Sequence, residues 1–253
     1  MHAVDDRDVS ATDPAAARVA LPRTLAIDIG GSGTKAAVFD AGGKMLGERV
    51  RVKTPVGKPP SALLAAIDGL AAKLSDFERV SAGFPGVVRG GAVVTSPNLE
   101  HEDWIGMDLA GALERMLGKP ARALNDADLQ GLGVIRGRGV EVFATLGTGV
   151  GFAVYQDGRL GPRLELAHHP LRKGRTYNEV LGDRARKKAG RAKWNRRVAE
   201  AIALWRTLTC FDRLYIAGGN AAKIDFELAL DVEIATNEQG LSGGVAAWRL
   251  IGV

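Results

Sequence analysis

Short apolar runs and segments of helical periodicity alternate along this chain. The runs Thr24–Ile29 (TLAIDI) and Val80–Phe84 (VSAGF) consist mostly of apolar or small residues and end at glycine or proline, as buried strands do. Between Leu63 and Leu74 the leucines and isoleucine instead follow helical spacing, which predicts an amphipathic helix. The pattern therefore favours an α/β fold with strands buried beneath helices.

The first half of the chain predicts eight elements in the order strand, strand, strand, helix, strand, helix, strand, helix. The glycines of Ala41-Gly42-Gly43 suit a hairpin turn between the second and third strands. Asp108 is a candidate N-cap for the second helix, which Gly118 and Pro120 end. The predicted strands are Thr24–Ile29, Thr34–Asp40, Lys44–Val52, Val80–Phe84 and Arg122–Asn125, and the helices are Leu63–Leu74, Leu109–Leu117 and a segment from Asp126 to about Ile135.

The second half repeats part of this order, which predicts two similar α/β lobes with a boundary near Gly137–Val140. We expect an N-terminal lobe at residues 21–137 and a C-terminal lobe at residues 138–253, with the last helix as a candidate to pack back on the N-terminal lobe. The elements of the second half are strands at Glu141–Leu146, Phe152–Gln156, Arg159 onward, Arg213–Ala217 and Val232–Ala235, a helical region at about Tyr177–Leu208 and a last helix at about Gly240–Leu250.

The composition is that of an ordinary globular protein, with 46% hydrophobic and 25% charged residues in a chain of 253. No uninterrupted apolar run is long enough to cross a bilayer. Residues 1–20 mix acidic and small residues without the apolar core of a secretory signal, which predicts a disordered leader. The single cysteine, Cys210, excludes an intrachain disulfide and a zinc site built from several cysteines, so a cytoplasmic protein is the simplest interpretation.

The net charge of +5 is concentrated in one stretch of the sequence. Between Arg172 and Arg197, eleven lysines and arginines accompany only Glu179 and Asp183, while the rest of the chain carries a net charge of −4. The stretch Arg172–Arg197 is termed the basic block below. Such a block attracts a polyanion, but it is equally typical of a solvated helical surface.

Two glycine-rich turns, one in each predicted lobe, lie between strands. In Asp28–Lys35 (DIGGSGTK) and Leu146–Gly151 (LGTGVG), closely spaced glycines allow backbone N–H groups to converge on a phosphate, although plain hairpins favour glycine as well. The first turn is not a P-loop, because Thr34 stands where that motif has glycine before its lysine. It is not a dinucleotide-binding turn either, since a strand rather than a helix follows it. Asp28, at the strand end, could hold Mg²⁺ directly or through water.

Asn125-Asp126 closes a predicted strand and opens a helix. Asp126 is there either an ordinary N-cap or a catalytic base at the carboxyl end of a strand, where α/β folds place their ligands. The residue alone does not decide between these roles, and the motifs around it have to be considered.

Eight short motifs follow one another along the chain. They are LAIDIGGSGTK (Leu25–Lys35), GFPG (Gly83–Gly86), SPNLEHEDWIG (Ser96–Gly106), LNDAD (Leu124–Asp128), TLGTGVG (Thr145–Gly151), ELAH (Glu165–His168), IAGGN (Ile216–Asn220) and NEQGLSGG (Asn237–Gly244). In this order, from about Leu21 to the C-terminus, the chain resembles the ROK-type sugar kinases, and within them the polyphosphate glucokinase branch. The resemblance implies a two-lobed actin-like ATPase (ribonuclease H-like) fold, with duplicated βββαβαβα lobes.

The resemblance also implies a role for each matched position. Asp126 resembles the catalytic base, and Asp28 the residue near Mg²⁺. The positions that match sugar-binding residues are Asn98, Asn125, Asp126, Glu165 and His168, with Glu179 as a looser match. The positions that match the phosphate and donor site are Asp28, Gly30, Gly31, Ser32, Gly33, Thr34, Lys35, Gly147, Thr148, Gly149, Gly218 and Gly219.

These residue types suit phosphoryl transfer to a sugar. Carboxylates accept hydrogen bonds from sugar hydroxyls, and asparagine amides both donate and accept. Mg²⁺ and backbone donors neutralise the transferring phosphoryl group. An aspartate is ionised at neutral pH, and its weak basicity suffices when the hydroxyl proton leaves late in a loose transition state.

The function implied by the resemblance is a Mg²⁺-dependent glucokinase acting on the 6-hydroxyl of glucose, cytoplasmic and homodimeric. The donor stays open between a nucleotide such as ATP and inorganic polyphosphate: IAGGN suits the first and the basic block the second. A kinase for mannose, fructose or N-acetylmannosamine and a non-catalytic sugar sensor are the alternatives. No structural zinc, no membrane and no nucleic acid are expected as partners, because the zinc-binding cysteines of many ROK proteins are absent and the leader is too short for the winged helix of ROK repressors.

One position departs from the family pattern. Ala167 stands before His168 where the family usually has glycine. Because alanine disfavours positive φ, we expect the local backbone, and with it the pose of His168, to differ.

Overall fold

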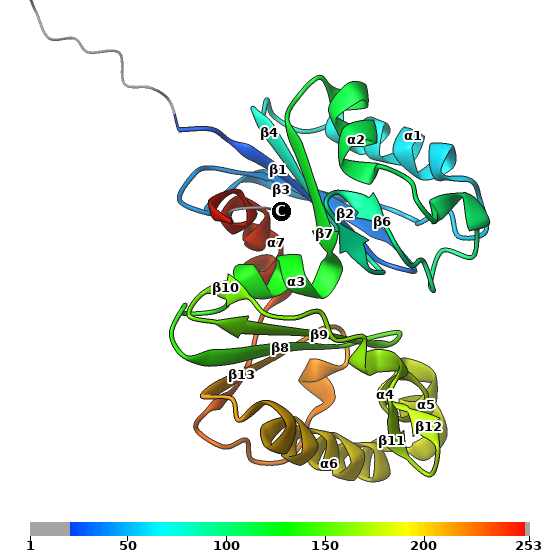
Figure 1. Cartoon of the computed structure of the whole chain (residues 1–253), viewed down its shortest axis with the longest axis vertical. Coiled ribbons are helices and arrows are strands. Elements are labelled where there is room, and N and C mark those ends of the chain that lie inside the picture. Colours follow the sequence, from blue (N-terminus) through cyan, green and yellow to red (C-terminus); the bar gives the residue numbers. More distant parts are fainter. Residues whose placement is uncertain (1–20, 251–253) are drawn as a thin grey trace, which may run out of the picture.

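The computed structural model describes residues 21–250, whose strands build two five-stranded sheets, one in the upper and one in the lower half of Figure 1. The predicted leader at residues 1–20 and the last three residues of the expected C-terminal lobe lie outside the described residues. None of the described helices is long and apolar enough to span a bilayer.

The first sheet consists, in spatial order, of β3 (Met45–Val52), β2 (Thr34–Phe39), β1 (Thr24–Ile29), β4 (Arg79–Phe84) and β7 (Ala121–Asn125). The first three strands pair antiparallel, whereas β1, β4 and β7 run parallel. The parallel strands therefore bring their carboxyl ends, Ile29, Phe84 and Asn125, to one edge of the sheet, where α/β folds bind ligands.

Alternation along β1 assigns its two faces to different helices. Leu25, Ile27 and Ile29 share a core with residues of α1 (Pro60–Ala71) and α2 (Leu109–Leu117). Ala26 faces the other way, toward α7 (Asn237–Ala246), where a Cβ on Gly244 would lie 2.7 Å from the Ala26 Cβ. The last helix thus packs on a strand of the first sheet, and a glycine permits the close approach.

The second sheet repeats the strand order and directions of the first. It consists of β10 (Arg159–Leu160), β9 (Val150–Gln156), β8 (Val140–Leu146), β13 (Arg213–Ala217) and β14 (Val232–Ile234), with the last three strands parallel. One face is covered by Trp194, Val198 and Trp205 of α6 (Arg191–Thr209). The other face packs on α3 (Asp126–Leu132), which lies between the two sheets beside α7 (Figure 1).

The second lobe is nevertheless not a complete copy of the first. Between β13 and β14, where the duplicated βββαβαβα pattern implied by the family resemblance has a helix, the chain forms only a single 3₁₀ turn, η3 (Ala221–Lys223). The predicted helical region from Tyr177 is divided into α4 (Tyr177–Leu181), α5 (Asp183–Ala189) and α6, because Gly182 and Gly190 leave the helical conformation. The last helix begins at Asn237 rather than Gly240, since Thr236 and Gln239 form a capping box.

Several short elements carry no signal in the hydrophobic pattern. They are the hairpin β5 (Val88–Arg89) and β6 (Ala92–Val93), the hairpin β11 (Pro170–Arg172) and β12 (Arg175–Thr176), and the 3₁₀ turns η1 (Glu102–Trp104), η2 (Leu166–His168) and η4 (Ala247–Arg249). Elements of two or three residues are too short to show periodicity.

Candidate active site

A cleft of about 830 Å³ lies between the two sheets and is lined by residues of both. The first glycine turn, the start of α3, the second glycine turn and the segment around η2 all contribute to it. The lining includes sixteen of the positions predicted from the sequence: Asp28, Gly30, Gly31, Ser32, Gly33, Lys35, Asn98, Asn125, Asp126, Gly147, Thr148, Gly149, Glu165, His168, Gly218 and Gly219.

Two predicted positions, Thr34 and Glu179, do not line this cleft. Thr34 is buried beneath the first glycine turn, and its hydroxyl lies 3.0 Å from that of Thr54, which in turn donates to the Gly30 carbonyl at 2.6 Å. Glu179 closes the capping box of α4, with its carboxylate accepting from the Thr176 amide at 2.8 Å. These hydrogen bonds lower the pKa of Glu179. Thr34 thus braces the turn, and Glu179 caps a helix.

Asn125, rather than Asp126, is the N-cap of α3. The Asn125 side-chain oxygen accepts from the amides of Ala127 at 2.9 Å and Asp128 at 3.2 Å, and its NH₂ group donates to the Gly86 carbonyl at 3.0 Å. The alternative that Asp126 caps the helix is therefore wrong. Asp126 is the first residue of α3 and lines the cleft, while the Asn125 amide is already engaged in the fold.

The carboxyl group of Asp126 has an unusual pKa. Burial and the nearby charge of Asp28 raise it to about 7, and Glu165 acts in the same direction. A 2.8 Å hydrogen bond from the Ala127 amide and the positive charge of Arg163 oppose the rise. A carboxylate with a pKa near neutrality can take up and release a proton at physiological pH, which is what a general base requires.

Asp28 is held by two side chains at the end of β1. Lys35 donates to its Oδ2 at 3.1 Å across the first glycine turn, and Gln130 of α3 donates to its Oδ1 at 3.0 Å. Gln130 is a site residue that the motifs did not single out. Its spacing of four from Asp126 places both on one face of the helix, and this was the available signal.

The second glycine turn is fixed from two neighbouring segments, α4 and the IAGGN segment at the end of β13. Asn178 of α4 accepts from the Val150 amide at 2.7 Å, and Asn220 donates to the Gly147 carbonyl at 3.1 Å. Gly218 follows β13 with a φ of +92°, and a Cβ there would lie 2.5 Å from the Leu146 carbonyl oxygen. The IAGGN segment therefore abuts the turn so closely that only glycine fits.

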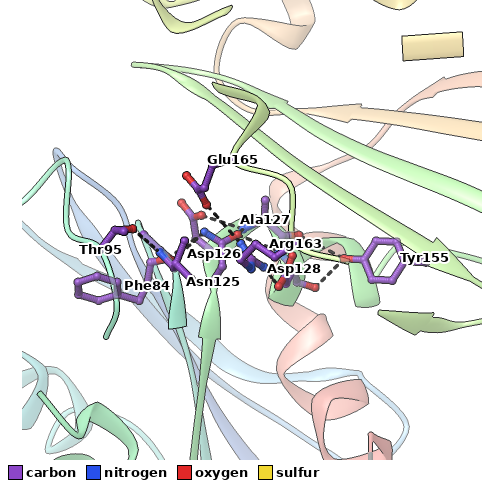
Figure 2. Close-up of polar contacts among 11 residues, drawn as sticks. Phe84, Thr95, Asn125, Asp126, Ala127, Asp128, Tyr155, Arg163 and Glu165 are labelled. Atoms are coloured by element: carbon purple, nitrogen blue, oxygen red, sulfur yellow. Dashed lines mark hydrogen bonds and ion pairs between the residues drawn. The ribbon is translucent and has the colours of Figure 1, made fainter. Parts of the chain in front are cut away.

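Glu165 immediately precedes η2 and His168 is its last residue, and both line the cleft. Glu165 Oε2 and His168 Nε2 are 4.0 Å apart. Ala167, in place of the family glycine, lies inside this 3₁₀ turn, where φ is negative, so the turn accepts alanine without strain. Figure 2 shows Glu165 beside Asp126, with Arg163 reaching toward Asp128.

The cleft also holds basic side chains that the motifs did not indicate. They are Arg51, Arg163, Arg186, Lys187 and Lys223. Arg186 and Lys187 belong to the basic block and pair with Asp183 at 2.8 and 2.6 Å. The basic block therefore reaches the cleft through α5. Seven of its eleven cations make no ion pair with any acidic residue in the described part of the chain.

Comparison with known proteins identifies the family. The ROK family model matches residues 24–167. The polyphosphate glucokinase of Mycobacterium tuberculosis (strain CDC 1551 / Oshkosh) is 30% identical over 212 residues, which cover 78% of this chain and 77% of that protein. The polyphosphate glucokinase of Mycobacterium leprae is 30% identical over 219 residues, or 79% of this chain, but these span only 64% of its length.

A solved structure shares the fold of this chain. The inorganic polyphosphate/ATP-glucomannokinase from Arthrobacter sp. strain KM superposes with a TM-score of 0.79 at 28% identity, over 90% of this chain and 99% of that one. Its fold agrees with the two-lobed α/β architecture implied by the sequence motifs. On the extent of the family match and the identity to these relatives, the chain belongs to the ROK family.

Proposed function

We propose that this protein is a glucokinase, which transfers a phosphoryl group to the 6-hydroxyl of glucose with Asp126 as the general base. The observation that carries the proposal is the position of Asp126: it opens α3 in a cleft lined by both glycine turns and by Glu165 and His168. Its pKa of about 7 allows it to be ionised at the start of the reaction. The named activities of the relatives agree with this reaction.

The acceptor sugar would bind against Asn98, Glu165 and His168, which line the same cleft as Asp126. Asn98 lies against the first glycine turn, since a Cβ on Gly31 would be 3.6 Å from its own Cβ. These carboxylate, imidazole and amide groups offer both donors and acceptors to sugar hydroxyls. Asp126 would then accept the proton of the attacking hydroxyl while backbone amides of the glycine turns stabilise the phosphoryl group.

A bound Mg²⁺ would neutralise charge on the phosphoryl donor. Asp28 fits it, because its carboxylate ends β1 beside the glycine turn and carries the hard oxygen atoms that Mg²⁺ prefers. No group of three or more ligating side chains occurs within residues 21–250, and Mg²⁺ in kinases commonly relies on one or two carboxylates plus phosphates. We therefore assign Asp28 to the metal, directly or through water.

For the donor we propose that both polyphosphate and a nucleoside triphosphate are used. The seven unpaired cations of the basic block, joined to the cleft by Arg186 and Lys187, favour a polyanion chain longer than a nucleotide. Gly219, which lines the same cleft, has no atom within 4 Å of an added Cβ and so leaves room for a nucleotide beside the second glycine turn. From the family resemblance we further propose a cytoplasmic homodimer with no nucleic-acid partner; sedimentation of the purified protein tests its oligomeric state.

A coupled assay for glucose 6-phosphate with Mg²⁺ tests the proposal, with ATP and polyphosphate as separate donors. Asp126→Ala should lower kcat by at least about 10³-fold while glucose still binds, because the base is absent but the other contacts remain. Asp157→Asn, in an exposed turn, is the matched control and should keep full activity. Near-normal turnover of Asp126→Ala, or no product with either donor, would overturn the assignment. Mannose, fructose and N-acetylmannosamine in the same assay decide the preferred acceptor.

A further inference from the structure

Arg163 lies among the carboxylates of the acceptor side of the cleft. It follows β10 in the second lobe, and its guanidinium forms a close ion pair with Asp128 of α3 (Figure 2). Its Nη1 also lies 3.8 Å from Glu165 Oε1. The side chains of Arg163 and Asp128 are only 19% and 14% exposed, so this pair is largely shielded from solvent.

This arrangement places the positive charge of Arg163 among several negatively charged carboxylates. Asp28 from β1, Asp126 and Asp128 from α3 and Glu165 from the η2 segment are the acidic groups, and Lys35 already pairs with Asp28. Burial lowers the pKa of Arg163, and the nearby charges of Glu165 and Asp126 offset only part of this effect. Without this guanidinium, Glu165 would face Asp126 and Asp128 with no compensating charge, and repulsion would favour its movement out of the cleft.

Arginine suits this position for a geometric reason. Its planar guanidinium has five N–H donors in a fixed fork and can contact two carboxylates at once. Here the two carboxylates belong to different segments, α3 and the turn at η2, which are 37 residues apart in the sequence. The contact therefore joins the helix that carries the base to the turn that carries Glu165 and His168.

We propose that Arg163 is a positioning residue which, anchored by Asp128, holds Glu165 in place for the acceptor sugar. This inference rests on the proposed sugar kinase function and extends it to a residue outside the motifs. It predicts a specific kinetic signature: loss of Arg163 should weaken binding of the sugar and leave binding of the phosphoryl donor unchanged, since the ion pairs of Arg163 are with Asp128 and Glu165 and not with either glycine turn.

The test compares Arg163→Met, Arg163→Lys, Asp128→Asn and the double variant Arg163→Met/Asp128→Asn in the coupled assay. Arg159→Met, an exposed arginine on β10, is the matched control. We expect Arg163→Met to raise the KM for glucose by about tenfold or more, with the KM for the donor within about twofold of wild type. Arg163→Lys should recover part of the loss, because lysine keeps the charge but not the fork.

Asp128→Asn separates positioning from a direct contact with the sugar. If Arg163 acts through its anchor, the double variant should be no worse than Arg163→Met alone, whereas independent roles give additive losses. Thermal unfolding measures the stability of each variant. If Arg163→Met is too unstable for kinetics, equilibrium binding of glucose is measured instead, and Arg163→Lys serves as the folded variant.

The outcomes are distinct. A wild type that phosphorylates no sugar overturns the proposed function. An active wild type with an unchanged KM for glucose in Arg163→Met, an equal rise in the KM for the donor, or additive losses in the double variant overturns the inference alone.

Discussion

Gln130 donates a hydrogen bond to Asp28 at 3.0 Å and so joins helix α3 to the first glycine turn. Lys35 holds the other oxygen of the same carboxylate at 3.1 Å. Asp126 and Gln130 are one helical turn apart, so the helix that presents the proposed general base also orients the carboxylate that we propose for the metal. The two halves of the proposed chemistry, proton acceptance and phosphate neutralisation, are thereby fixed to one element.

Gln130→Leu should therefore lower activity while leaving the fold intact. Leucine keeps most of the side-chain volume but cannot donate, so Asp28 loses one of the two contacts that orient it. A hydrogen bond worth about 1 kcal/mol corresponds to a roughly fivefold fall in kcat/KM. Steady-state kinetics at varied Mg²⁺ measure the effect. Gln156→Leu, at the exposed end of β9, is the control, and equal activity of the two variants would show that the contact has no role.

The pKa of Asp126 predicts both a pH–rate profile and a stability effect. Because the base must be ionised, kcat/KM should fall about tenfold per pH unit below an apparent pKa near 7. For stability, the folded pKa lies above the unfolded value of 3.8, so folding favours the protonated form. The stabilising contribution is complete below the unfolded pKa and is lost as the pH rises through the folded one.

The Asp126→Asn variant has no ionisable group at this position. Its free energy of unfolding should therefore rise relative to that of the wild type as the pH rises. We expect its advantage in free energy of unfolding to grow between about pH 5 and about pH 8.5, by an amount on the order of 2–3 kcal/mol. Calorimetry at the two pH values measures it, with Asp157→Asn as a control that should show no such trend. A constant difference in Tm would mean that the carboxyl group has an ordinary pKa.

Substitution by alanine should destabilise the protein at one of the two adjacent glycines after β13 and leave its stability unchanged at the other. Gly218 has a φ of +92°, and an added Cβ would lie 2.5 Å from the Leu146 carbonyl oxygen, whereas nothing lies within 4 Å of a Cβ on Gly219. Gly218→Ala should therefore cost about 1–3 kcal/mol of stability and displace the second glycine turn. Gly219→Ala should fold normally.

Activity with the two donors extends this comparison. If a nucleotide lies over Gly219, Gly219→Ala should raise the KM for ATP and leave the KM for polyphosphate unchanged. A similar loss of stability in both variants, measured by thermal unfolding, would contradict the packing argument for Gly218.

The elements best predicted from the sequence were those with a continuous apolar run and a clear stop. Thr24–Ile29, Arg213–Ala217 and Leu109–Leu117 begin and end where the pattern placed them, since glycines, a proline or an N-cap aspartate adjoin them. The division of the region after Tyr177 into three helices was missed, because Gly182 and Gly190 lie in a charged segment where hydrophobic periodicity gives no information.

The candidate site could be predicted only as far as its motifs extend. The glycine turns and Asp126 are contiguous in sequence and so are visible there. The contacts of Gln130 with Asp28 and of Arg163 with Asp128 join residues 102 and 35 positions apart, and they depend on how α3 packs between the sheets. No local pattern encodes such a pairing, and Gln130 and Arg163 are the residues that sequence reasoning missed.

A single buried carboxylate accepts most of the backbone hydrogen bonds of residues 136–139, which connect the two sheets. Glu141, which is 1% exposed, accepts hydrogen bonds from the amides of Arg136, Gly137 and Arg138 at 2.7, 2.6 and 3.1 Å. The Tyr215 hydroxyl donates to it at 2.9 Å, and burial together with this carboxylate raises the pKa of Tyr215. All four donors require an acceptor, and the carboxylate supplies it for three successive amides of this linker, while Asp157 accepts from the next amide, that of Gly139.

Glu141→Gln should consequently destabilise the protein more than its small change in volume suggests. The amide NH₂ group replaces one acceptor oxygen and faces backbone N–H groups that then have no partner, at a cost of about 2–4 kcal/mol. For a chain of this size that corresponds to a fall in Tm of roughly 5–15 °C. Glu233→Gln, which removes a partly exposed partner of Arg136 and Arg213, should cost less than about 1 kcal/mol. Thermal unfolding compares the two variants, and limited proteolysis should cut Glu141→Gln preferentially at residues 136–139. Equal stability of both variants would show that the linker does not need its buried acceptor.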